Sequence, residues 1–393
     1  MASVLKFRTA LTKSRKRMPT PRSPVMVALS GGATSSALLR LMSDFQNMEL
    51  KGSAAEPKYA GLVAGHVDES ALFSGYQPTQ ICDIATALGV ECLVARLEDV
   101  FTLDSDKDAL LELVHATIAP GTSRDHFCVR LTKGDESVSA KERLRALFAG
   151  LGSATDKEDM LHTIKSFLLA RLARQAQCKL LLLADSATRI AAKLVSLTSR
   201  GRGFSLPLEV GAEAPFMGCN DLTVYRPMRD LIMKEVAFFN LWTAQPSVVV
   251  PTFTTGAPET ASIDRLTEAF VVGLDRDFVS TVPTVCRTVQ KLELRPDAKS
   301  AAQCIVCHMP AESNAQEWRN RLTVNIAPSQ QPQLEQQPDD TLSSFDVTAR
   351  LCYSCQSMLH FSKPGAMLPA FCVENYRNSV ADLRQQIEEF IIE

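Results

Sequence analysis

Residues 25–39 place the strongest constraint on what this chain can fold into. The run VMVAL has the length of a short buried strand, and Ser30, Gly31 and Gly32 follow it directly. Small residues then lead into the helical pattern ALLRLM, which starts at residue 37. The segment therefore predicts a strand, a tight glycine turn and the first turns of a helix. Free N–H groups at such a turn, together with the helix dipole, favour an anion and typically a phosphate.

Several polar residues near this turn are candidates for nucleotide binding. Glycine allows a close approach and hydroxyl groups add donors, so the candidate phosphate ligands are Ser30, Gly31, Gly32, Ser35 and Ser36. At the end of the next apolar run, His66 and Asp68 fall where the adenosine of a nucleotide would lie. A plain glycine turn, with Asp68 in a surface turn, is the alternative interpretation.

Apolar runs alternate with helical patterns as far as residue 245. We expect strands at 25–29, 59–67, 92–97, 179–184 and 222–226, and helices near 35–46, 78–88, 161–176, 187–199 and 231–241. The run LLLL at 180–183 lacks alternation, which indicates a strand buried on both faces. The order predicts an α/β fold with a doubly wound parallel sheet. Ligands of such sheets bind beyond the carboxyl ends of the strands, where the glycine turn falls.

The chain is long enough for more than one domain. We expect a basic N-terminal helix or arm at 1–24, an α/β domain at 25–245 with an insertion at about 98–160, a connector and helix at 246–295, and a cysteine-containing module at 296–393. Residues 327–345 of that module are rich in Gln and Pro, which predicts disorder.

Composition excludes several classes of protein. A net charge of −2 excludes a globally basic nucleic-acid binder, although not a local basic patch. The longest apolar runs are too short and interrupted to span a bilayer, so we expect no membrane partner. Residues 1–24 lack the apolar segment of a secretory signal. The eleven cysteines are therefore expected to be reduced thiols or metal ligands.

Two groups of basic residues are candidates for RNA binding. The first group precedes any acidic residue in the sequence, and its candidates for RNA binding are Lys13, Arg15, Lys16 and Arg17. A mitochondrial presequence and a solvated basic face are alternative interpretations of this segment. The second group lies at the end of a helix and after the fifth strand, and it consists of Arg200, Arg202, Arg226 and Arg229. Arginines clustered at one sheet edge suit phosphate oxygens, although ion pairs with Asp230 or Glu235 would be structural. Asp185 and Arg189 could likewise pair with each other.

Four cysteines have the spacing of a metal site. They form two Cys-x-x-Cys pairs, Cys304 with Cys307 and Cys352 with Cys355. Two such knuckles complete a tetrahedral thiolate shell, and zinc is the ion that best suits it in a zinc-ribbon-like module. An iron–sulfur cluster and redox thiols are the alternatives, and His308 or His360 could replace a cysteine. The other cysteines are expected to be mostly core residues: Cys82, Cys92, Cys128, Cys178, Cys219, Cys286 and Cys372.

The glycine turn resembles the pyrophosphate (PP) loop, Ser-Gly-Gly-x-Asp-Ser, of enzymes that use ATP to adenylate a carbonyl or amide oxygen. It departs from that loop at Ala33 and Thr34, where Lys and Asp are usual. A wider resemblance covers nearly the whole chain and is carried by residues 25–36, 181–194, 200–203, 225–240, 257–263, 304–307 and 351–355. These segments are similar to the second subunit of the cytosolic tRNA 2-thiolation complex, a paralogue of the catalytic tRNA thiouridylase.

The resemblance implies a fold, a function and partners. The fold would be of the PP-loop, adenine nucleotide alpha hydrolase-like type. The chain would act in the cytoplasm as a heterodimer with the thiouridylase, placing sulfur on C2 of uridine 34 in Lys, Glu and Gln tRNAs. The sulfur would arrive on a thiocarboxylated ubiquitin-related carrier protein, which this chain meets indirectly. Family members often carry further Cys-x-x-Cys pairs upstream of the basic segment, and we expect this chain to lack that N-terminal metal module.

The sequence argues against independent catalysis. The turn lacks its Lys and Asp, so Mg-ATP binding is expected to be weak or absent. Thiouridylases carry Cys-x-x-Cys-Gly before the helix that precedes the fourth strand, where this chain reads DKEDML at 156–161. Sulfur transfer needs a nucleophilic thiolate, and no catalytic cysteine pair is found. The alternatives are an independent ATP-dependent adenylating or sulfurtransferase enzyme, and a zinc-stabilised scaffold without a role in RNA.

Overall fold

The computed structural model describes residues 2–15, 23–52, 59–101, 138–217, 219–299, 301–312 and 350–360, together with residues 315, 318, 369, 371 and 372. Every structural statement below concerns these residues. The predicted disordered stretch at 327–345 and Cys128 lie outside them.

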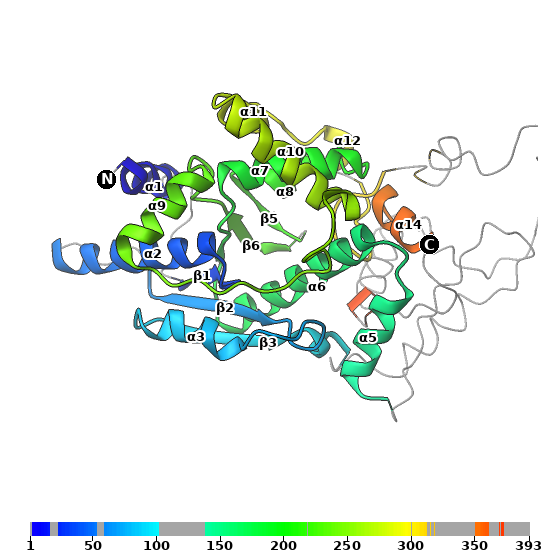
Figure 1. The fold of residues 1–393 in the computed structure, drawn as a ribbon, viewed down its shortest axis with the longest axis horizontal. Helices are drawn as coiled ribbons and strands as arrows, with labels where there is room; N and C mark the ends of the chain where they lie inside the picture. The colour runs from blue at the N-terminus through cyan, green and yellow to red at the C-terminus, as the bar shows by residue number, and fades with distance from the viewer. Residues whose placement is uncertain are drawn as a thin grey trace, which may run out of the picture. The chain divides into compact units, whose positions relative to one another are not determined.

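A six-stranded sheet organises the described part of the chain (Figure 1). Its strands are β1 (Val25–Ala28), β2 (Leu62–Asp68), β3 (Glu91–Arg96), β4 (Leu180–Leu182), β5 (Glu213–Phe216) and β6 (Cys219–Tyr225). Their spatial order is β3-β2-β1-β4-β6-β5. All neighbours pair in parallel except β5, which runs antiparallel to β6 at the edge. The predicted α/β fold with a parallel sheet is therefore confirmed.

Helices connect the strands in the manner of a doubly wound sheet. The α-helices are α1 (Ala2–Arg15), α2 (Ala33–Gly52), α3 (Pro78–Thr86), α5 (Ala140–Gly150), α6 (Ala154–Gln175), α7 (Ala187–Ser199), α8 (Leu206–Val210), α9 (Met233–Thr243), α10 (Ile263–Asp277), α11 (Thr281–Val289), α12 (Pro296–Lys299) and α14 (Tyr353–His360), and the 3-10 helices are η1 (Leu97–Phe101) and η2 (Glu259–Ala261). The chain moves outward from β1 to β3 and then returns past β1 to β4. Right-handed crossovers therefore put α2 and α3 on one face and α6 on the other.

The centre of the sheet is buried on both faces, as the unbroken apolar runs predicted. Leu180, Leu181 and Leu182 are all buried, and in register they pair with Val25, Met26 and Val27. A second apolar cluster joins α7, α8, α10 and α11, and it includes Ile190, Leu197, Val271, Val282 and Val289. Figure 1 shows α1, α2 and α9 gathered beside one another, and these helices are in mutual contact.

The predicted strands all exist, with bounds within three residues of those observed. The sequence missed β5, a short edge strand that contains Pro215, because proline is atypical of strands and is tolerated only at an edge. It also placed the start of α6 too late. Ser153 caps this helix by accepting from Asp156 N (3.1 Å), which starts it at Ala154.

Chain contacts divide the protein into two compact units. The first contains residues 1–99 and 153–294, and the second contains residues 100–152 and 295–393. The sheet and α1 belong to the first unit, and the two Cys-x-x-Cys pairs belong to the second. A compact unit is not by itself an independently folding domain, so the domain bounds expected from the sequence stay predictions. No described helix is both long and apolar enough to span a membrane.

Candidate functional site

The glycine turn follows β1 at the carboxyl edge of the sheet, as predicted. Gly31 has φ = +81°, a left-handed conformation that glycine adopts readily. Ser30 is exposed, and its Oγ lies 3.1 Å from Ser35 Oγ. Ser35 Oγ donates to Gly32 O (3.0 Å), and Ser36 Oγ donates to Gly31 O (3.2 Å). Two of the candidate hydroxyls are thus buried and donate their protons inside the turn.

Segments distant in sequence cover the turn. Val248 N donates to Gly31 O (2.8 Å), and Asn240 Nδ2 of α9 donates to Ala33 O (2.8 Å). Ile81 of α3 packs so closely that a Cβ on Gly31 would lie 2.7 Å from Ile81 Cγ1. The turn is therefore held by α3, α9 and residue 248. No local pattern in the sequence linked these segments to it. Whether the turn binds a phosphate stays a prediction.

His66 and Asp68 lie at the end of β2, beside the turn. His66 Nδ1 lies 2.9 Å from Leu29 O, and because a carbonyl only accepts, Nδ1 carries the proton. Burial lowers the pKa of His66, so the ring is neutral and Nε2 is an acceptor. Nε2 is buried and has no hydrogen-bond partner among the described residues. Asp68 Oδ1 accepts from Ser70 N (2.8 Å) and from Tyr76 Oη (3.1 Å), which is the hydrogen bonding of a turn.

A buried ion cluster joins the ends of β4 and β6. Lys193 Nζ lies 2.9 Å from both carboxylate oxygens of Asp185, and Arg226 Nε lies 3.0 Å from Asp185 Oδ2. Burial alone would raise the pKa of Asp185, but Lys193 and Arg226 outweigh it and hold that pKa well below its usual range. The sequence missed Lys193, which lies in α7. Arg189, which could have paired with Asp185, forms an ion pair with Glu268 (3.6 Å).

Three of the four arginines expected to bind RNA are engaged by carboxylates of this chain. Arg202 NH2 lies 2.7 Å from Asp159 Oδ2 and Arg200 NH1 lies 3.0 Å from Asp159 Oδ1, while Arg226 holds Asp185. Arg202 and Arg226 are only 5% and 4% exposed. A phosphate would have to displace a buried carboxylate to reach them, which leaves a buried charge uncompensated. These three side chains form ion pairs within the chain, with partners other than Asp230 or Glu235, and their contact with RNA stays a prediction.

The remaining basic candidates for RNA binding are either less buried than these three arginines or have side chains outside the described residues. Arg229 is half-buried after β6. The backbone of α1 includes Lys13 and Arg15, but their side chains, and the whole of Lys16 and Arg17, lie outside the described residues. The helix itself is firmly packed, because Phe7 and Leu11 are buried and Tyr225 Oη donates to Ala10 O (2.7 Å).

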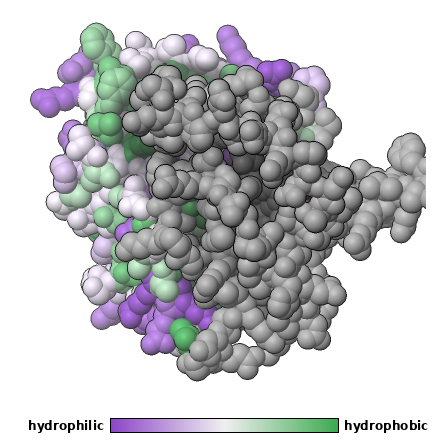
Figure 2. Space-filling model, turned by 90° about the vertical axis from the view of Figure 1, so that its right-hand side faces the viewer, coloured by the Kyte–Doolittle hydropathy of each residue, from purple (hydrophilic) through white to green (hydrophobic). Residues whose placement is uncertain are grey.

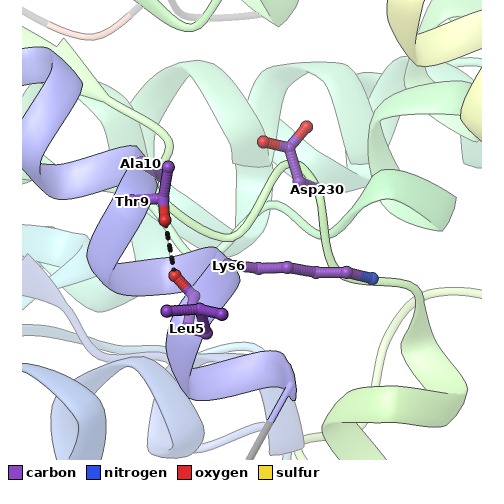
Figure 3. A pocket seen from close by; sticks show the side chains of 5 residues that line it. All are labelled: Leu5, Lys6, Thr9, Ala10 and Asp230. Carbon is purple, nitrogen blue, oxygen red and sulfur yellow. Dashed lines mark hydrogen bonds between the residues drawn. The ribbon is translucent and has the colours of Figure 1, made fainter.

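A pocket of about 240 Å³ lies between α1 and the turn before α9 (Figure 3). Its lining residues are Leu5, Lys6, Thr9, Ala10 and Asp230. Thr9 Oγ1 donates to Leu5 O (2.9 Å), and Lys6 Nζ is paired with Glu235 (2.7 Å). The hydroxyl and the ammonium group of this pocket are therefore already engaged by the protein, and we assign it no ligand.

The four predicted metal ligands converge. The Sγ atoms of Cys304, Cys307, Cys352 and Cys355 all lie within 4.8 Å of one another and are buried. Cys304 N donates to Met309 O (2.9 Å), and Ile305 N donates to Arg350 O (3.2 Å), which ties one knuckle to the other. Hydrogen bonds with Cys304 and Cys307 raise the pKa of Cys352 well above its ordinary value. This donor set fits a metal ion, whose charge would allow the thiols to ionise.

The surroundings of the cluster answer two further expectations. Among the described residues, the group that could hold a metal consists of the four cysteines and does not include His308. The side chain of His360 is outside the part of the chain that the structure describes. Cys372, expected to be an ordinary core residue, is buried, and Cys304 and Cys307 add to the effect of burial in raising its pKa. Its distance from the knuckles in sequence gave no signal of this proximity.

A cysteine also approaches the carboxyl edge of the sheet. Cys286 of α11 is buried, and its Sγ donates to Ala187 O (3.2 Å) at the start of α7. Burial raises its pKa to about 11. At neutral pH it is a thiol rather than a thiolate, so it is a poor nucleophile.

Comparison with known proteins gives consistent family matches. A family model described as cytoplasmic tRNA 2-thiolation protein 2 matches residues 262–357. The protein of that name from Bos taurus is 33% identical in an alignment that covers 77% of this chain and 65% of the relative. The protein from Danio rerio is 30% identical, and its alignment covers 79% of this chain and 67% of the relative. The chain thus spans about two thirds of these relatives' length.

The chain is also similar to a solved structure, the U34-tRNA thiolase NcsA from Methanococcus maripaludis with its [4Fe-4S] cluster. The identity is 15%, the match covers 75% of this chain and 80% of that one, and the TM-score is 0.47. A likeness at this level carries no weight for the chemistry. Sequence identity over most of the chain identifies the family, and this chain belongs to the cytoplasmic tRNA 2-thiolation protein 2 family.

Proposed function

We propose that this chain is a non-catalytic subunit of the cytoplasmic machinery that 2-thiolates uridine 34 of Lys, Glu and Gln tRNAs. Family membership supports the reaction class. The observation that carries the non-catalytic role is the state of the glycine turn, where the hydroxyls of Ser35 and Ser36 donate to the turn's own carbonyls and are not free to donate to a phosphate. Ala33 and Thr34 add no charge for Mg-ATP.

A catalytic partner must then supply the reactive sulfur chemistry, and we propose the thiouridylase paralogue as that partner. It would receive sulfur from the thiocarboxylated ubiquitin-related carrier. In this chain Cys286, a described thiol that contacts Ala187 after β4, has a raised pKa and a backbone carbonyl as its partner. Such a thiol does not attack an activated uridine readily.

The partner's docking surface, on this proposal, is one face of α9. Phe238, Leu241 and Trp242 lie three and four residues apart and are 72%, 79% and 92% exposed. Val249, beyond the helix, is also exposed. Contiguous apolar side chains of this size on a water-exposed helix mark protein interaction sites. Figure 2 shows a different face, where described hydrophobic side chains are also exposed at the upper left beside hydrophilic ones.

The tRNA contact is assigned to the basic N-terminal segment and Arg229. With Arg200, Arg202 and Arg226 held in ion pairs, the phosphate ligands we propose are Lys13, Arg15, Lys16, Arg17 and Arg229. Contacts of this kind add affinity without sequence specificity.

The metal at the four cysteines is proposed to be zinc with a structural role. Four thiolates close a tetrahedral shell and leave no position open for substrate. Zinc would then stabilise the fold of the second unit, while an iron–sulfur cluster is the alternative that metal analysis separates from it.

The test is co-expression of the chain with the thiouridylase paralogue in cells that lack both proteins, with 2-thiouridine in tRNA measured by mass spectrometry. We expect modification only when both chains are present. Leu241→Glu should abolish co-purification and lower modification, whereas Phe270→Ser, at another exposed apolar position on α10, should change neither. Full modification without this chain would overturn the proposal.

One observation favours an independent ATP-dependent enzyme as a second candidate. His66 Nε2 is a buried acceptor without a partner beside the turn, and a nucleotide amino group could satisfy it. Calorimetry with Mg-ATP decides between the two candidates. Binding that is lost in Ser30→Ala and in His66→Leu would support the enzyme, and the absence of binding would support the non-catalytic subunit.

A further inference from the structure

Two cysteines outside the metal cluster lie in direct contact. Cys82 in α3 and Cys92 at the start of β3 have their Sγ atoms 3.2 Å apart, with Cys92 donating to Cys82. Both side chains are half-buried, so small solutes can reach them. The other described thiols in the first unit differ, because Cys178 and Cys286 are buried and bond to backbone carbonyls.

The backbone holds this pair in place without a contribution from the sulfurs. After α3 the chain turns through Gly89, at φ = +69°, and Val90 N donates to Ala85 O (3.0 Å). Ile84 and Ala85 anchor α3 to the sheet, and Cys92 lies in register with Ala64 of β2. The two thiols are therefore brought together by a short, well-packed helix–turn–strand unit.

We propose that Cys82 and Cys92 form a reversible disulfide, a redox modification site separate from the metal cluster. The sulfurs need only approach from 3.2 Å to the bond length of about 2.05 Å. With hydrogen peroxide as oxidant, deprotonated Cys82 attacks one peroxide oxygen and releases hydroxide, giving a sulfenic acid. Cys92 sulfur then attacks Cys82 sulfur, its proton joins the departing hydroxide as water, and the disulfide forms. A dithiol reductant reverses the step.

The reaction would act on the glycine turn through Ile81. This residue precedes Cys82, and its side chain packs directly on Gly31. A bond from Cys82 to Cys92 ties α3 to β3 and so fixes one wall of the turn. Burial raises the pKa of Cys92, which is consistent with Cys82 reacting first with the oxidant and Cys92 resolving the product.

Peptide mapping of the full, metal-loaded chain tests this proposal. The sequence has no Lys or Arg between Lys58 and Arg96, so trypsin leaves both cysteines in one peptide. After mild peroxide treatment, unfolding and alkylation, we expect this peptide to be two hydrogen atoms lighter and unalkylated. Cleavage after Glu91 separates the cysteines, and the two fragments should stay joined until a reductant is added.

Matched controls make the result decisive. Peptides that contain Cys178 or Cys286 should remain fully alkylated in the same sample. Cys82→Ser and Cys92→Ser should each abolish the joined fragments, and circular dichroism of each variant shows whether it is folded. Oxidation should raise the melting temperature of the parent chain and leave both serine variants unchanged. Alkylation of both Cys82 and Cys92 after peroxide treatment of the folded parent chain would overturn the proposal.

Discussion

The glycine turn and the four-cysteine cluster are both polar sites predicted from short motifs, but the two sites differ in how their polar atoms are bonded. At the turn, hydroxyls, carbonyls and neighbouring amides satisfy one another. At the cluster, four sulfurs converge in a buried space, where hydrogen bonds with Cys304 and Cys307 raise the pKa values of Cys352 and Cys355. A turn whose hydroxyls are already bonded within the chain tolerates the absence of a ligand, and a cluster of four converging thiols does not.

Metal removal should therefore produce the largest effect. Cys355→Ser deletes one of four thiolates, and we expect loss of bound metal and of the fold around residues 301–312 and 350–360. Metal binding to such sites is worth about 10 kcal/mol of folding free energy. Elemental analysis of the purified chain, with hydrogen exchange of both units, measures this. Cys178→Ala is the control, and a Cys355→Ser protein that keeps stoichiometric zinc would contradict the assignment.

The ion cluster at the end of β4 should show the next largest effect. Asp185→Asn leaves Lys193 and Arg226 buried with their charge uncompensated, which costs about 3–5 kcal/mol. Urea unfolding of the variant measures the loss. Asp221→Asn breaks the exposed pair with Arg174 and should change stability little. Equal losses in the two variants would mean that burial does not distinguish these ion pairs.

Gly31→Ala tests how tightly the turn is closed. Alanine at φ = +81° is strained, and its Cβ would lie 2.7 Å from Ile81 Cγ1, so we expect a loss of about 2–3 kcal/mol. Gly32→Ala is the matched control, because its Cβ would meet nothing nearer than Ser30 Oγ at 3.7 Å. Urea unfolding compares the two variants. A Gly31→Ala protein as stable as its Gly32→Ala counterpart would show that Ile81 yields without cost.

The contrast also explains what the sequence could and could not predict. The strands and the cysteine pairs depend on local pattern and spacing, so VMVAL, LLLL and both Cys-x-x-Cys motifs were identified correctly. The contacts of Val248, Asn240 and Ile81 with the turn join segments that local pattern does not relate. The same limit applies to the RNA candidates: the sequence around Arg202 does not show whether its side chain faces solvent or, as in the structure, pairs with the buried carboxylate of Asp159.

The smallest expected effect is a pH dependence from His66. Its pKa is lowered by burial in the folded chain, whereas in the unfolded chain it titrates near 6.5. Below about pH 6.5 the unfolded state therefore binds the proton first, and stability falls on acidification by about 1.4 kcal/mol per pH unit at most. In His66→Gln this component is absent, so unfolding free energies measured between pH 7.5 and about 5 should have a shallower slope. Unchanged slopes would mean that the ring accepts a proton in the fold, and that the unpartnered Nε2 beside the turn is open to water instead of being sealed within it.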